Sequence, residues 1–155
     1  MPSLRPARSI RIDAVRLRMH TYRMNPLLLL GTIAIAIAGL FHIAIFMLES
    51  VLWSKPSTWR RFGVRSQEEA DVVAPMAYNQ GFYNLFLAAG ALVGVVLIWL
   101  GSLPDAGVAV ALFAAASMAL AALVLLLSNR RLARAAAMQG ALPLLGVILV
   151  VLSLL

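Results

Sequence analysis

The chain has 155 residues, of which 63% are hydrophobic and only 12% are charged, and its net charge is +7. Soluble globular domains are about half apolar and about a quarter charged, so this composition excludes that class and predicts an integral membrane protein. The absence of cysteine excludes disulfides, thiolate nucleophiles and cysteine-ligated metal sites.

The chain begins with a basic arm, residues 1–25, that contains six arginines and no signal-peptide cleavage pattern. One interpretation is an interfacial arm, attracted to anionic lipid by about 1 kcal/mol per arginine. The other is that translation starts at Met24, so that the arm is not part of the protein. With the arm, the two membrane faces carry six and seven basic residues; without it, the split is zero and seven.

The seven basic residues beyond the arm lie beside apolar segments: Lys55, Arg60, Arg61, Arg65, Arg130, Arg131 and Arg134. This placement suits lipid headgroups and membrane topology, and no nucleic-acid-binding motif accompanies it. We therefore expect membrane lipids as partners and exclude nucleic acid. With a start at Met24, the positive-inside rule predicts that the first and third connections face the cytoplasm and that both termini face outward.

Four apolar segments follow the arm, and each is long enough to cross a membrane. They are Leu27–Leu52, Met76–Leu100, Ala106–Leu127 and Ala135–Leu155. Backbone hydrogen bonds must be closed internally in lipid, and these segments lack the alternation of barrel strands, so we predict helices. The short second and third connections predict that consecutive helices pack antiparallel.

The first connection is the only long one, and it contains the capping-box sequence Ser66-Gln67-Glu68-Glu69. This sequence predicts a short helix, after which Pro75 begins or kinks the second span. The predicted fold is all-α: an integral membrane antiparallel four-helix bundle in one domain, residues 26–155, with a short interfacial helix between spans 1 and 2.

Polar residues within the spans, apart from Ser117 at mid-helix, are predicted to lie in the half of the membrane next to the basic connections. At about 1.5 Å per residue, His42 lies about 3 Å and Glu49 about 13 Å from the middle of the first span. The polar residues of the second and fourth spans lie about 6 to 12 Å from the middle, on the same side. Together they predict a polar chamber lined by His42, Glu49, Asn79, Gln80, Tyr83, Asn84 and Gln139.

His42 and Glu49 are seven residues apart and therefore share a helix face, which makes them a candidate catalytic acid–base pair. His42 has two further interpretations: a haem ligand, or a neutral side chain that joins helices through a hydrogen bond to Gln139 or Asn84. Glu49 has the alternative of an interfacial glutamate that extends toward water or pairs with Lys55. One histidine and one glutamate fall short of a zinc site, so no metal site is predicted.

The remaining chamber residues, Asn79, Gln80, Tyr83, Asn84 and Gln139, are candidate ligand-binding residues that orient the polar atoms of a substrate. Their alternative role is interhelical hydrogen bonding, worth only about 0.6 kcal/mol per bond on average. One or two such bonds would be enough to join helices, so four crowded side chains between Asn79 and Asn84 favour recognition.

Four sequence elements carry a family resemblance: FHIAIFMLESVLW (residues 41–53), FGV (62–64), NQGFYNLFLAAG (79–90) and QGALP (139–143). They resemble the small bacterial membrane proteins grouped as domain of unknown function 1304, over about residues 24–155. The resemblance implies a four-helix membrane protein and no established activity.

We expect a multi-pass protein of the bacterial cytoplasmic (inner) membrane, acting as an enzyme or binding protein for a lipophilic small molecule or a lipid. Whether it is an enzyme stays open, and its cofactor is unknown, with haem on His42 as a special case. One rival is a non-catalytic scaffold or assembly subunit. Another is a small proton-coupled transporter, which requires a homo-oligomer because four helices seldom enclose a pathway alone.

Overall fold

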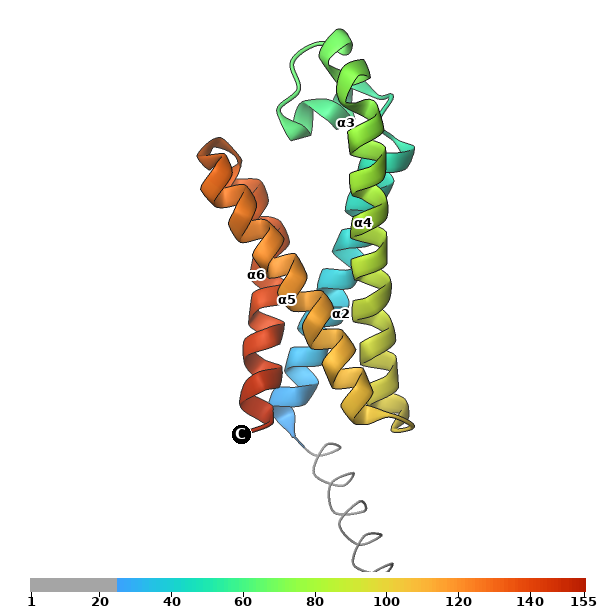
Figure 1. Ribbon diagram of the computed structural model, residues 1–155. Helices are drawn as coiled ribbons and strands as arrows, with labels where there is room; N and C mark the ends of the chain where they lie inside the picture. The colour runs from blue at the N-terminus through green and yellow to red at the C-terminus, as the bar shows by residue number, and fades with distance from the viewer. Residues whose placement is uncertain (1–24) are drawn as a thin grey trace, which may run out of the picture.

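The computed structural model describes residues 25–155, so the basic arm and the proposed start at Met24 lie outside the described residues. Four helices in this range are long and apolar enough to cross a membrane, and they run antiparallel (Figure 1). They are α2 (Pro26–Phe46), which continues into the π-helix η1 (Met47–Val51), α4 (Gln67–Leu100), α5 (Pro104–Ser128) and α6 (Ala133–Ser153). The predicted all-α four-helix membrane bundle is confirmed, and the chain is a multi-pass membrane protein.

The first connection forms differently from the prediction in one respect. The Ser66 side chain accepts the Glu69 N–H, and the Glu69 carboxylate accepts the Arg65 N–H, so a cap does form at this sequence. The helix that starts here does not end before Pro75, however, but continues as the 34 residues of α4. Proline removes only one N–H from the helix, and the carbonyl that it leaves without a donor belongs to exposed Asp71.

The short helices between the first two spans are instead α3 (Pro56–Trp59) and the 3-10 turn η2 (Arg60–Phe62). At about 1.5 Å per residue, α4 is roughly 50 Å long, whereas the hydrocarbon core of a bilayer is about 30 Å thick. The first turns of α4 therefore extend beyond the hydrocarbon, next to these short helices. A further 3-10 turn, η3 (Arg130–Leu132), joins α5 to α6.

The four long helices form a ring, in which α2 packs against α4 and α6, and α5 packs against the same two helices. Glycines allow the helices to approach closely. A Cβ on Gly94 would lie 2.8 Å from the Ala111 Cα, and one on Gly31 would lie 2.8 Å from a Val150 methyl. Without an apolar-to-water driving force inside lipid, such close backbone packing is what holds helices together.

Two hydrogen bonds connect the ring at the end opposite the basic connections. Asn25 caps α2 through its side-chain oxygen and also donates its Nδ2 to the Ser153 carbonyl at 3.0 Å, joining the start of α2 to the end of α6. Trp99 on α4 donates its indole N–H to the Thr32 hydroxyl on α2 at 3.0 Å. The apolar core also lies in this half, where Ile35 and Val150 are fully buried.

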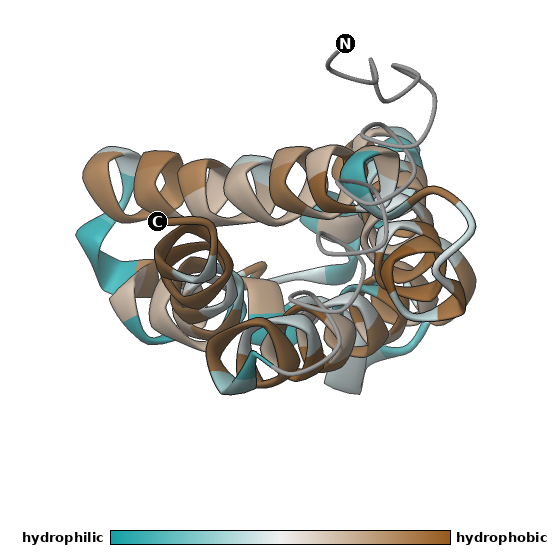
Figure 2. Ribbon diagram, turned by 90° about the horizontal axis from the view of Figure 1, so that it is seen from below, coloured by the Kyte–Doolittle hydropathy of each residue, from teal (hydrophilic) through white to brown (hydrophobic). Residues whose placement is uncertain are grey.

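The ring separates into two pairs toward the first and third connections. In Figure 1, α5 and α6 lean away from α2 and α4 at this end. On α4, Gly90 and Gly94 meet α5, whereas Gln80 and Tyr83, further along the same heptad-spaced stripe, are exposed. Seen along the bundle in Figure 2, the ribbons are mostly brown or pale, as expected for helices that face lipid. The polar residues therefore lie where the two pairs diverge.

Candidate functional site

Glu49 and Asn84 are the two predicted site residues that the structure brings into direct contact. Asn84 Nδ2 donates to Glu49 Oε2 at 2.8 Å and also to the Gln80 carbonyl at 3.2 Å. Both side chains are only 8% exposed. The bond joins the first and second spans and places a carboxyl group inside the bundle. Glu49 therefore does not extend to water, and the expected pairing with Lys55 is not observed.

The π-helical turn η1 positions Glu49. The Leu52 N–H donates to the Met47 carbonyl at 2.9 Å, five residues earlier, as in a π-helix. Such widened turns are rare, and they occur frequently at functional sites. A widened turn rotates the residues that follow it about the helix axis, relative to a regular α-helix. The seven-residue spacing of His42 and Glu49 therefore does not by itself place the two side chains on the same helix face.

Gly81 on α4 lets η1 approach closely enough for this contact. A Cβ at Gly81 would collide with the Ser50 hydroxyl and lie 3.2 Å from the Glu49 Cβ. The same hydroxyl donates to the Tyr78 carbonyl at 2.8 Å, which fixes η1 against α4. A larger residue at position 81 would therefore displace the Ser50 side chain at the point where the carboxylate enters the bundle.

His42 is 2% exposed and lies on α2, deeper in the bundle than Glu49. Its Nδ1 contacts the Ala38 carbonyl at 2.9 Å, and because a carbonyl only accepts, Nδ1 carries the proton. A neutral ring then presents an unprotonated Nε2. The expected hydrogen bond from His42 to Gln139 or Asn84 does not form within residues 25–155, nor does one to Glu49.

Gln139 is half-buried on α6 and lies level with His42. The packing of Gly146 on Ile35 sets this register, because Gln139 and His42 each lie seven residues further toward the basic connections on antiparallel helices. Pro143 is buried and has no N–H to donate to the Gln139 carbonyl. The Gln139 carbonyl is therefore a hydrogen-bond acceptor without its usual helical donor.

Asn79, Gln80 and Tyr83 are exposed, and Tyr83 retains 53% of its accessible surface. No hydrogen bond joins these three side chains to Glu49 or His42 in the described part of the chain. They lie on α4 beside the region from which α5 leans away. A molecule that reached Glu49 from this side would pass Gln80 and Tyr83.

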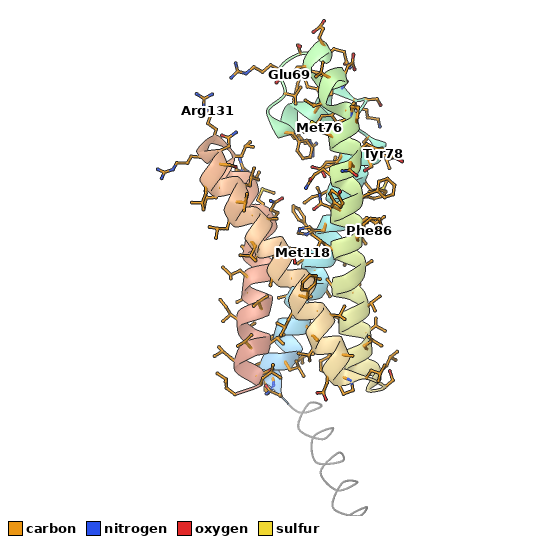
Figure 3. All side chains as sticks on the ribbon, viewed as in Figure 1. Glu69, Met76, Tyr78, Phe86, Met118 and Arg131 are labelled. Carbon is orange, nitrogen blue, oxygen red and sulfur yellow. The ribbon has the colours of Figure 1, made fainter. Side chains whose placement is uncertain are left out.

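An aromatic row on α4 was not predicted. Tyr78, Phe82 and Phe86 have successive ring centroids 5.0 and 6.2 Å apart, and Phe46 on α2 lies 5.2 Å from Phe82. Figure 3 shows Tyr78 and Phe86 pointing outward from α4, away from α5 and α6. The four-residue spacing of 78, 82 and 86 was the available signal. This row covers the side of α4 that faces lipid.

Within residues 25–155, no group of three or more His, Asp or Glu side chains is arranged to hold a metal ion. The side chains in the divergent region include one carboxyl, one imidazole and several amide groups, with the Tyr83 phenol nearby. These groups can bind and orient a molecule, and the carboxyl and imidazole can exchange protons with it.

A family model described as "Protein of unknown function (DUF1304)" matches residues 36–151 of the chain. The matched range contains all seven predicted site residues. No curated protein and no solved structure matches the chain.

Proposed function

Given that the chain belongs to the family described as "Protein of unknown function (DUF1304)", we propose that it binds a lipophilic molecule inside the membrane through Glu49 and Asn84. The observation that supports this proposal is the buried Glu49–Asn84 contact at the level where the two helix pairs diverge. His42 lies deeper, and Gln80, Tyr83, Asn79 and Gln139 surround the approach.

A glutamate is a costly choice if its only role is to join helices. Interhelical hydrogen bonds in membranes contribute about 0.6 kcal/mol on average, whereas burying a carboxylate costs several kcal/mol. Glutamine could accept the same Asn84 N–H without that cost. Ionisable residues inside membranes are accordingly associated with function.

The divergence of α5 and α6 supports lateral access from the bilayer. Gly90 and Gly94 of α4 pack against α5 in the half opposite the basic connections. Gln80 and Tyr83 lie on the same face of α4 in the other half, where they are exposed because α5 leans away. We place the site in the membrane half next to the first and third connections. With a start at Met24, the positive-inside rule assigns this half to the cytoplasmic side of a bacterial inner membrane.

Binding is the step that the geometry favours. Because His42 and Glu49 do not bond to each other, an acid–base reaction would need a substrate that contacts both groups. The bound molecule could in one case be haem, with the unprotonated Nε2 of His42 as its iron ligand. A Soret absorbance band in the wild type that is lost in His42→Ala would identify haem.

Native mass spectrometry of the protein released from mild detergent tests the proposal. We expect a discrete added mass on the wild type that His42→Ala and Asn84→Ala both lose. Glu68→Gln serves as the matched control, because Glu68 is exposed at the start of the same helix, away from the proposed site. A protein without added mass in all samples, with unchanged assembly, would support the scaffold alternative. The transporter alternative requires a dimer, so a strictly monomeric protein would count against it.

A further inference from the structure

Resting on the proposed function, we propose that the ligand's polar group is a cation, held as an ion pair by Glu49. The ligand class is a lipophilic amine, in which a protonated amino group is joined to a long alkyl or ring system. The inference combines the charge distribution of the protein with the hydrogen-bonding groups around Glu49.

The carboxyl group of Glu49 has no cationic partner in the described part of the chain. It forms no ion pair there, and its one hydrogen bond comes from the neutral Asn84 amide. All seven basic residues within 25–155 are exposed and lie in or beside the first and third connections. Figure 3 shows one of them, Arg131, pointing outward from the end of the α5–α6 pair.

Buried charges in proteins are usually paired, and intramembrane carboxylates in particular face a partner or an aqueous path. The protein supplies no cation at Glu49, and this side chain is only 8% exposed, so an ionised Glu49 would take its complementary charge from a ligand. An anionic lipid or a fatty acid would be repelled here, although the basic connections would attract either to the membrane surface.

The hydrogen-bonding inventory leads to the same ligand class. Glu49 Oε1 and Asn84 Oδ1 are acceptors, and neither is used in a hydrogen bond within residues 25–155. A primary ammonium offers three donors and no acceptor, whereas an alcohol offers one donor and a carboxylate none. The alkyl chain of such an amine can stay in the hydrocarbon of the bilayer, so the protein needs to hold only the headgroup.

Three probes with the same chain length test the inference: dodecylamine, 1-dodecanol and dodecanoic acid. Binding is measured by titration into the full-length protein in phosphatidylcholine nanodiscs, with empty nanodiscs correcting for partition into lipid. We expect dodecylamine to bind the wild type roughly tenfold or more tightly than 1-dodecanol, the ratio expected for one charge-assisted hydrogen bond.

Glu49→Gln should reduce dodecylamine affinity to that of the alcohol. Glutamine keeps an oxygen that can accept the Asn84 N–H, so the helix contact is preserved, and thermal unfolding checks that the variant is folded. Glu68→Gln, which removes an exposed carboxylate at the start of α4, is the matched control and should leave the preference unchanged.

Three further outcomes distinguish a failure of this inference from a failure of the proposed function. If the wild type binds amine and alcohol equally and Asn84→Ala loses both, the lipophilic site stands and its cation selectivity is wrong. If Glu49→Gln retains the preference for amine, or if no probe binds the wild type, the inference is overturned.

Discussion

Replacing Asn84 by alanine removes the only hydrogen bond that the Glu49 carboxyl receives within residues 25–155. Hydrogen bonds to charged groups contribute about 1.5–3 kcal/mol in soluble proteins, whereas interhelical bonds in a membrane protein average about 0.6 and reach about 1.7 kcal/mol. Both side chains are only 8% exposed, so we expect the upper part of the membrane range, about 1.5 kcal/mol.

A double-mutant cycle isolates this interaction, because Asn84→Ala also removes the 3.2 Å contact to the Gln80 carbonyl. The free energy of unfolding is measured by titration with sodium dodecyl sulfate for the wild type, Asn84→Ala, Glu49→Ala and the double variant. Exposed Asn79→Ala is the control and should change the stability by less than about 0.5 kcal/mol. A coupling energy between Glu49 and Asn84 below about 0.5 kcal/mol would refute the reasoning.

Three further predictions concern the packing of the bundle. Gly94→Ala should destabilise by about 1–3 kcal/mol in the same assay, because its Cβ would meet the backbone of the facing helix; Gly90→Ala, with its nearest contact at 3.4 Å, should be tolerated. Trp99→Phe should cost about 0.6 kcal/mol through loss of one interhelical hydrogen bond, measured as a shift in the unfolding midpoint. Ser66→Ala should cost about 1 kcal/mol and increase hydrogen exchange in the first turn of α4.

The number and type of the spanning helices, and the approximate limits of the first, third and fourth, could be predicted because hydrophobic length and polar connections determine them. The second span was harder, since Pro75 is a common helix boundary. A helix continues across a proline where the carbonyl left without a donor is accommodated, as at Asp71, which is an exposed residue. That condition depends on the surroundings in three dimensions and is not encoded in the local sequence.

The sequence allowed us to predict which residues lie in the candidate site, but not which of them contact one another. Depth along the helices placed Glu49 and Asn84 in the same half of the membrane, but their contact depends on the π-turn and on the close approach at Gly81. A single widened turn has no reliable sequence signature. The lean of α5, which leaves Gln80 and Tyr83 exposed, results from the sum of many packing contacts and cannot be derived from one segment.

The ring arrangement has a consequence for the order of folding. Helices α2 and α4, α4 and α5, and α5 and α6 are consecutive in the chain, so three of the four main packing contacts can form between neighbours as each helical hairpin inserts. Only the contact of α6 with α2, marked by the bond from Asn25 to Ser153, joins distant parts of the sequence. The entropic cost of bringing these distant segments together is therefore incurred in a single late step. Assembly of this bundle should therefore be sequential, with docking of the last helix on the first as the event that completes it.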